Sequence, residues 1–205
     1  MKTYIKTFAA AALSIIALST LNFRPTGIQP GEVAKDFSLE NIDGNKVSLA
    51  SLTDVKGCIL VFTCNHCPFS KMYEGRIVQL DSMYKSKGYP VVAINPNDTA
   101  QYPEDDMEAM KVRAAEKGFT FPYLRDETQE IALAYGAEKT PHVYVLQKIS
   151  GTFMVKYVGA IDNNPKDANA VTDTYVQRAV NELLEGKPVS LTSTKAIGCG
   201  IKWKK

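Results

Sequence analysis

The feature that most constrains the fold is a continuous apolar segment, residues 58–62, which runs directly into the cysteines Cys64 and Cys67. An uninterrupted apolar run of this length is typical of a strand buried on both faces. Apolar residues then recur at intervals of three and four up to Gly88, which predicts one face of a helix: Phe69, Met72, Tyr73, Ile77, Leu80 and Tyr84. We therefore expect the cysteine pair at a junction between a buried strand and a helix.

The rest of the chain predicts an alternating order of strands and helices. The patterns indicate strands at residues 36–40, 90–95, 142–146 and 153–158. They indicate one helix from Pro103 to Gly118, a short one from Asp126 to Gly136 and a final one from Val171 to Leu184. Asp126 followed by Gln129 resembles a capping box. The order is a β-α-β half, an insertion of residues 97–136 and a β-β-α half. It matches the α/β thioredoxin-like fold, a central mixed β-sheet flanked by helices, here with an N-terminal strand extension and a C-terminal tail.

Two cysteines separated by two residues at a helix start suit disulfide exchange. Exchange needs one thiol that ionises near neutral pH and a second that displaces a trapped partner. Because helix N-termini favour anions, we interpret Cys64 as the nucleophile and Cys67 as the resolving thiol, buried one turn along. His66 can stabilise the thiolate, although an inert surface histidine explains its position equally well.

The small number of cysteines narrows the alternatives for this motif. Cys58 and Cys199 are the only others in 205 residues, too few for a domain held together by disulfides. A zinc site would need a second cysteine pair, and His142 is the only histidine besides His66. A purely structural disulfide across so short a loop would restrict the unfolded chain little. We therefore expect neither a metal nor a cofactor.

Thr140-Pro141, at the start of a predicted strand, is the second candidate part of the site. A peptide bond before proline can be cis, and in this fold the backbone before such a proline can pair with an extended substrate chain. An ordinary trans proline at a strand start is the alternative. With the cysteine pair nearby, we expect the cis form.

The first residues have the pattern of an export signal. Lys2 and Lys6 precede an apolar run at residues 8–18, which is short for a membrane span, and Ala17-Leu18-Ser19 offers a cleavage site. We expect a signal peptide at residues 1–19, a linker at 20–30 and one redox domain at 31–205. An uncleaved N-terminal anchor is the alternative, and it would be the only membrane contact. Both place the domain in the periplasm or cell envelope, where cysteines can be oxidised.

The charge balance argues against nucleic-acid binding. Lys and Arg number 24 and Asp and Glu 22, a net charge of +2, which supplies no field for following a phosphate backbone. The expected partners are protein or small-molecule thiols and disulfides, together with an electron donor that the sequence does not name.

Four stretches carry a resemblance to a known family: Phe62-Thr63-Cys64-Asn65-His66-Cys67-Pro68, Asn95-Pro96-Asn97-Asp98 with Tyr102-Pro103-Glu104-Asp105, Phe121-Pro122-Tyr123-Leu124 with Asp126-Glu127-Thr128, and Ile197-Gly198-Cys199-Gly200-Ile201-Lys202-Trp203. With them the chain resembles the redoxin, or alkyl hydroperoxide reductase/thiol-specific antioxidant, superfamily. Within it the chain is similar to the peroxiredoxin-like branch that carries a C-x-x-C motif.

The resemblance also implies a rival function, antioxidant peroxide reduction, because Cys67 stands where a peroxiredoxin keeps its peroxide-attacking cysteine. Such a site also uses a proline and a threonine or serine, whose positions here hold Leu60 and Cys64. Its arginine would lie near Thr140-Pro141. Without these groups the leaving oxygen lacks stabilisation, so we favour thiol-disulfide exchange. A binding module with incidental cysteines is the third alternative.

Cys199 is predicted to be an accessory redox thiol that forms a disulfide with Cys64 or Cys67. It lies between two glycines in a tail after the final helix, where the backbone is free to move or to be closely approached. Apolar residues alternate in the same tail, so an edge strand with an inert Cys199 is the alternative. We interpret Cys58 as a small buried apolar residue.

Overall fold

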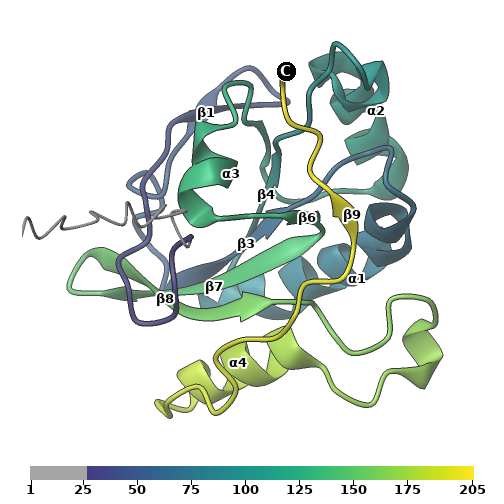
Figure 1. Cartoon of the computed structure of the whole chain (residues 1–205). Helices are drawn as coiled ribbons and strands as arrows, with labels where there is room; N and C mark the ends of the chain where they lie inside the picture. The colour runs from purple at the N-terminus through teal and green to yellow at the C-terminus, as the bar shows by residue number, and fades with distance from the viewer. Residues whose placement is uncertain (1–26) are drawn as a thin grey trace, which may run out of the picture.

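The computed structural model describes residues 27–205, so the predicted signal peptide at 1–19 lies outside the described residues. The core is a seven-stranded mixed β-sheet with helices on both faces (Figure 1). In spatial order its strands are β2 (Lys46–Val47), β1 (Leu39–Asn41), β5 (Tyr123–Arg125), β4 (Val91–Asn95), β3 (Gly57–Phe62), β7 (His142–Ile149) and β8 (Thr152–Gly159). A separate two-stranded sheet joins β6 (Lys139–Thr140) to β9 (Cys199–Gly200).

Strand β3 has the central position that its apolar sequence predicts. It pairs in parallel with β4 and antiparallel with β7, and all six of its residues are buried. A strand covered on both faces needs apolar side chains pointing both ways, which explains the absence of alternation in residues 58–62. The change from a parallel to an antiparallel neighbour leaves the carboxyl end of β3 next to the start of β7.

Three helices cover one face of the sheet: α1 (Pro68–Tyr84), α2 (Met107–Lys117) and α4 (Tyr175–Leu184). Tyr73, Ile77, Leu80 and Tyr84 of α1 pack there against β3 and β4, as predicted. The two other residues of the predicted face differ, since Phe69 is only partly buried and Met72 is 47% exposed. Short 3-10 turns flank these helices at η1 (Lys85–Lys87), η2 (Pro103–Asp105) and η3 (Ala168–Ala170).

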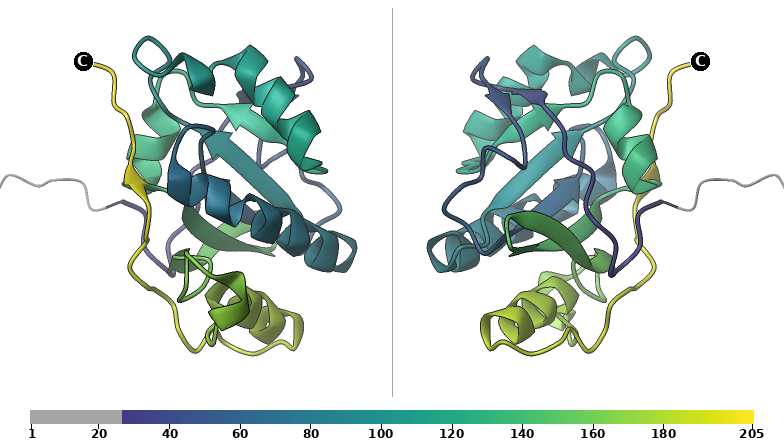
Figure 2. Two further views of the ribbon diagram at one scale, coloured as in Figure 1. Left: turned by 90° about the vertical axis from the view of Figure 1, so that its right-hand side faces the viewer. Right: turned by 90° about the vertical axis from the view of Figure 1, so that its left-hand side faces the viewer.

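The opposite face is covered by α3 (Glu130–Tyr135), by the N-terminal segment and by Ile201 of the C-terminal tail. The N-terminal segment joins the sheet at Gly31 and Ala34, whose N–H groups donate to carbonyls of β8. Figure 2 shows the tail running along one edge of the molecule, past both the sheet and the start of α1.

Three predicted helix starts were wrong. The helix expected from Pro103 begins at Met107 after the N-cap Asp106, because Pro103–Asp105 form the 3-10 turn η2. The final helix begins at Tyr175 rather than Val171, because the preceding residues form η3 and an extended connection. The N-cap of α3 is Gln129, not Asp126, although the Asp126 carboxylate accepts a hydrogen bond from the backbone N–H of Ala132. The predicted insertion also contributes β5 to the sheet through parallel pairing with β4. Among residues 27–205, no helix is long and apolar enough to cross a membrane.

Candidate active site

The cysteine pair lies at the junction of β3 and α1, as the sequence predicts. The helix begins at Pro68, and Cys67 is its N-cap residue. Cys64 therefore lies before the helix rather than in its first turn, and Cys67 is the cysteine at the helix N-terminus. The sequence placed Cys64 at the helix start and Cys67 one turn further along. In the structure Cys67 is at the helix start, because Pro68 is the first helical residue.

The disulfide in this structure joins Cys67 to Cys199, not to Cys64. The two Cα atoms are 6.1 Å apart, an ordinary separation for a disulfide, and 132 positions separate the residues in sequence. Cys64 is a free thiol, 2% exposed, and Cys67 is fully buried. The tail cysteine thus lies within the predicted site, and its part in a redox cycle stays a prediction.

Thr140 contacts the sulfur atoms of both cysteines of the pair. Its hydroxyl lies 3.2 Å from Cys64 Sγ, and its carbonyl oxygen lies 3.3 Å from Cys67 Sγ. The Ser70 hydroxyl, on α1, is 3.7 Å from Cys64 Sγ. The Thr140-Pro141 peptide bond is cis, as predicted. The fold therefore brings Thr140, 76 residues along the chain from Cys64, against the pair.

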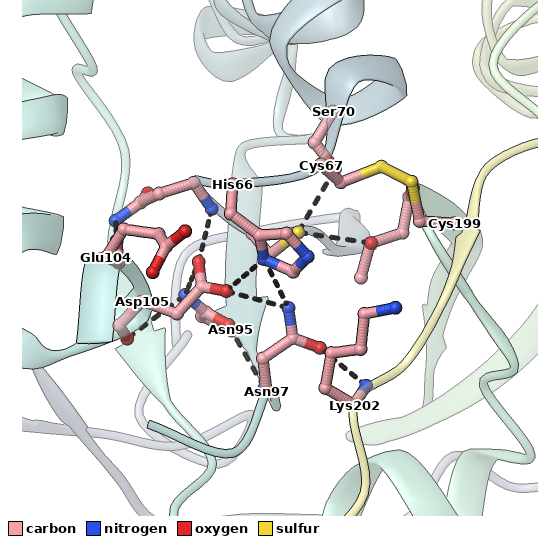
Figure 3. A network of polar contacts seen from close by, with 12 residues as sticks. His66, Cys67, Ser70, Asn95, Asn97, Glu104, Asp105, Cys199 and Lys202 are labelled. Atoms are coloured by element: carbon pink, nitrogen blue, oxygen red, sulfur yellow. Dashed lines mark hydrogen bonds and ion pairs between the residues drawn. A yellow bond between two sulfur atoms is a disulfide. The ribbon is translucent and has the colours of Figure 1, made fainter. Parts of the chain in front are cut away.

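The ring of His66 is held by a buried carboxylate. His66 Nδ1 lies 2.5 Å from Asp105 Oδ2, and the side chain of Asp105 is fully buried (Figure 3). The His66 ring also has an aromatic neighbour: the Tyr102 ring stacks on it with a centroid distance of 4.6 Å. His66 is therefore a positioned residue, not an inert one on the surface.

Asp105 accepts hydrogen bonds from several other donors in this network. The backbone N–H of Asn65 donates to Oδ1 over 2.6 Å, Asn97 Nδ2 donates to Oδ2 over 2.9 Å, and Asn95 Nδ2 donates to Oδ1 over 3.2 Å. Burying a carboxylate is costly unless its oxygens are paired in this way. The network holds the backbone between the cysteines, because Asn65 is one of its donors.

The two histidines have opposite electrostatic settings. Hydrogen bonding to Cys64 raises the pKa of His66 to about 9, against the lowering by partial burial, and the hydrogen bond to Asp105 adds to the rise. Burial lowers the pKa of His142, at the start of β7, to about 4. At neutral pH His66 is consequently a cation beside Cys64, while His142 is uncharged.

The cluster of Cys64, His66 and Asp105 offers ligand atoms within 4.8 Å of one another, a spacing that a metal site would also need. Two ligands of a tetrahedral zinc ion lie about 3.3 Å or more apart, given metal-nitrogen and metal-oxygen bonds of about 2.0–2.1 Å. The His66–Asp105 separation of 2.5 Å is that of a hydrogen bond. Both Asp105 oxygens also accept N–H donors. Hydrogen bonding accounts for the cluster.

The fourth cysteine lies apart from this site. Cys58 is in β3, fully buried in the apolar cluster on the α3 face of the sheet, and burial raises the pKa of its thiol. The interpretation of Cys58 as a small apolar residue agrees with this position.

Asp105, Asn97 and Gln129 were missed as functional candidates. Asn97 links the site to the tail, because its side-chain oxygen accepts a hydrogen bond from the backbone N–H of Lys202. Asn97 and Asp105 do occur in the stretches that resemble the redoxin superfamily. The position of Asn97, just beyond the buried strand β4, could have marked it as a site residue. Polar residues at this position gather at the edge of the sheet where the parallel strands end.

Comparison with known proteins decides the family. Residues 30–163 match the model of the AhpC/TSA family. The chain belongs to the AhpC/TSA family. Among solved structures, an uncharacterized conserved protein from Geobacillus kaustophilus is 42% identical, with a TM-score of 0.80 over 87% of this chain and 94% of that one. A thiol:disulfide interchange protein of the thioredoxin family from Chlorobium tepidum TLS, 22% identical with a TM-score of 0.57 over 76% and 97%, shares the thioredoxin fold.

The names of two relatives point to two chemistries. Thiol-disulfide oxidoreductase ResA of Geobacillus thermodenitrificans is 24% identical over 90% of this chain and 93% of its own. A protein of Mycobacterium tuberculosis named "Putative peroxiredoxin Rv2521" is 28% identical over 67% and 85%. Both names describe thiol redox proteins, and the predicted thioredoxin-like fold and family are confirmed.

Proposed function

We propose that this protein is a thiol-disulfide oxidoreductase of the bacterial cell envelope that works through Cys64, Cys67 and Cys199. The observation that carries the proposal is that Cys67 is bonded to Cys199 while its sulfur and that of Cys64 both contact Thr140. One sulfur atom can thus exchange partners within a single buried site. Exchange by thiolate attack requires this kind of proximity.

The chemistry balances as three successive exchanges. In the reduced protein, the Cys64 thiolate attacks a substrate disulfide, forms a mixed disulfide and releases the first substrate thiol. The Cys67 thiolate then attacks Cys64 Sγ, which releases the second substrate thiol and leaves a Cys64–Cys67 disulfide. The Cys199 thiolate attacks Cys67 Sγ, frees Cys64 and forms the Cys67–Cys199 disulfide. A dithiol donor returns two electrons, and the reverse order oxidises a dithiol partner.

His66 and Asp105 support the first exchange. A cation at His66 stabilises negative charge on Cys64 Sγ, Cys64 in turn raises the pKa of His66, and the buried Asp105 carboxylate adds to this rise and orients the ring. These residues act as positioning and charge-stabilising groups, a role that was expected of the helix N-terminus and, as one of two alternatives, of His66. The location outside the cytoplasm rests on the signal pattern of residues 1–19.

A pair of double variants tests which cysteine attacks. Cys67→Ser with Cys199→Ser leaves Cys64 without either resolving thiol, so a model peptide disulfide should form a lasting adduct on Cys64, detected by intact-mass and peptide mass spectrometry. Cys64→Ser with Cys199→Ser is the matched control and should form little adduct. An adduct only in the control would assign the attacking role to Cys67, and no adduct in either variant would contradict the proposed function.

Peroxide reduction is the second candidate, because the family and one relative's name point to it. A fast peroxidase needs donors that stabilise the leaving oxygen. The four arginines of the described residues, Arg76, Arg113, Arg125 and Arg178, have partners in Asp162, Glu74, the Asn95 carbonyl and Asp173. None of these is a cysteine of the site. We expect slow oxidation of the reduced protein by hydrogen peroxide, and a stopped-flow rate constant of about 10⁷ M⁻¹s⁻¹ or more would instead favour a peroxidase.

A further inference from the structure

The C-terminal tail, residues 197–204, is docked as an extra strand at the candidate site. In β9, Cys199 and Gly200 pair antiparallel with Thr140 and Lys139 of β6. The backbone N–H of Ile201 donates to the Glu138 carbonyl over 3.1 Å, which continues the pairing. Strand pairing thus holds the tail independently of the disulfide.

Side chains from two other elements bind the tail beyond Ile201. The backbone N–H of Lys202 donates to Asn97 Oδ1 over 2.9 Å, and the Lys202 carbonyl accepts from the backbone N–H of Asp98 and from Gln129 Nε2, each over 2.8 Å. The Lys204 N–H donates to Gln129 Oε1 over 2.7 Å. Both ends of one amide therefore bind the tail backbone, and Gln129 has a left-handed backbone with φ of 64°, unusual for a residue other than glycine. These contacts involve the backbone of the tail, so other extended chains could make them.

Gly198 is the point where the tail comes closest to the site. A Cβ atom at this position would lie 2.3 Å from the Thr140 carbonyl oxygen and 3.1 Å from the Pro141 nitrogen. At Gly200, on the other side of Cys199, a Cβ would meet nothing within 4 Å. Only glycine at position 198 lets the chain lie this close to Thr140, whose carbonyl oxygen contacts Cys67 and whose hydroxyl contacts Cys64.

The tail pairs with β6, the strand to which an incoming polypeptide substrate would also have to bind. β6 ends at the Thr140-Pro141 bond, and the free edge of a short strand pairs readily with an extended chain through backbone hydrogen bonds. The tail uses this edge, and in this register it delivers a cysteine to Cys67 (Figure 3).

We infer that the tail is a built-in stand-in for the substrate chain, and that the β6 edge binds a partner segment of the same kind once the tail has left. This inference rests on the proposed function. The Cys67–Cys199 disulfide locks the tail over the edge, and its reduction leaves only the noncovalent contacts, which a partner can displace. The oxidised protein is therefore closed to polypeptide substrates.

The docked tail also specifies the chemistry of the partner. The partner is an extended segment with glycine at the position that faces the Thr140 carbonyl, because any Cβ there would meet this oxygen. Three positions after that glycine it carries an apolar residue, since Ile201 is 6% exposed and packs in the apolar cluster beside α3. Its backbone beyond that residue binds Asn97 and Gln129.

A thiol-free peptide tests this site without any redox chemistry. The probe is a fluorescein-labelled peptide with the sequence of residues 196–203 in which serine replaces the cysteine, and binding is measured by anisotropy. The full-length Gly198→Ala protein, reduced, should bind the probe at least about tenfold more tightly than the oxidised wild type, because apparent affinity scales with the fraction of molecules whose site is open. Reduced Gly200→Ala is the matched control and should resemble the reduced wild type.

Two further measurements make the result decisive. Hydrogen exchange at the amides of residues 199–204 should be faster in reduced Gly198→Ala than in reduced Gly200→Ala, and a probe with alanine in place of its first glycine should bind weakly. Equal probe binding by oxidised wild type and reduced Gly198→Ala would overturn the inference, as would release of the tail without any gain in probe binding. Because the probe has no thiol, these outcomes are independent of whether the protein catalyses disulfide exchange.

Discussion

At the scale of single residues, the site is governed by a buried acid and two histidines in opposite environments. Hydrogen bonding to Cys64 and to the fully buried Asp105 raises the pKa of His66, whereas burial lowers the pKa of His142. Such contrasts in protonation are typical of functional sites. The position of His66 between Cys64 and Asp105 resembles the nucleophile, base and orienting-acid arrangement used by other cysteine enzymes.

The histidines give the first prediction, a wide separation of their titrations. The chain has only two histidines, so NMR of the ring protons should resolve one titration near pH 9, from His66, and one near pH 4, from His142. His66→Gln should remove only the first. Since the folded pKa of His66 exceeds its unfolded value of about 6.5, its stabilisation is complete below pH 6.5 and is lost as the pH rises through about 9. Two titrations near 6.5 would contradict the network.

The second prediction concerns Asp105 itself. Asp105→Asn removes the negative charge and turns an amide group toward N–H donors, so we expect the pKa of His66 to fall toward 6.5 and the free energy of unfolding to drop by about 1–3 kcal/mol. Asp106→Asn is the matched control, because Asp106 caps α2 and asparagine caps nearly as well. Equal effects of the two substitutions on His66, followed by NMR, and on urea unfolding would argue against a specific role for Asp105.

At the scale of elements, β3 supports the site from within the sheet. Its residues pack on both faces, so truncating one of them leaves a cavity in an apolar cluster. We expect Leu60→Ala, at a fully buried position, to lower the free energy of unfolding by about 2–5 kcal/mol. Val112→Ala, on a side chain of α2 that is 58% exposed, should change it by less than about 0.5 kcal/mol. Urea unfolding of both variants measures this, and similar losses would mean that β3 is not the centre of the core.

At the scale of the whole molecule, the disulfide ties the tail to the first helix across most of the chain. It closes a loop with a sequence separation of 132, and a link of this length restricts the unfolded chain strongly. We expect the oxidised wild type to exceed Cys199→Ser in free energy of unfolding by about 2–5 kcal/mol. Reduced wild type should match Cys199→Ser in urea unfolding. Equal stability of the oxidised and reduced wild type would contradict a Cys67–Cys199 link.

Much of the architecture was predictable from local patterns. The apolar run at residues 58–62 became β3, and Gly118 and Gly136 end helices in the left-handed conformation that favours glycine. Helix starts were harder, because Val171 and Asp126 have suitable sequences but the chain there makes other hydrogen bonds. Local propensity is a weak guide wherever tertiary contacts supply alternatives.

By itself, the sequence determined that a cysteine pair lies between a buried strand and a helix, because apolar periodicity and glycine positions act over a few residues. Only the tertiary structure decided that Cys67 pairs with Cys199 rather than Cys64, that Asp105 is the partner of His66, and that the tail lies along β6. These groups are distant in sequence and meet only when the strands converge. Their pairing depends on packing and burial across the whole domain, which no local pattern records.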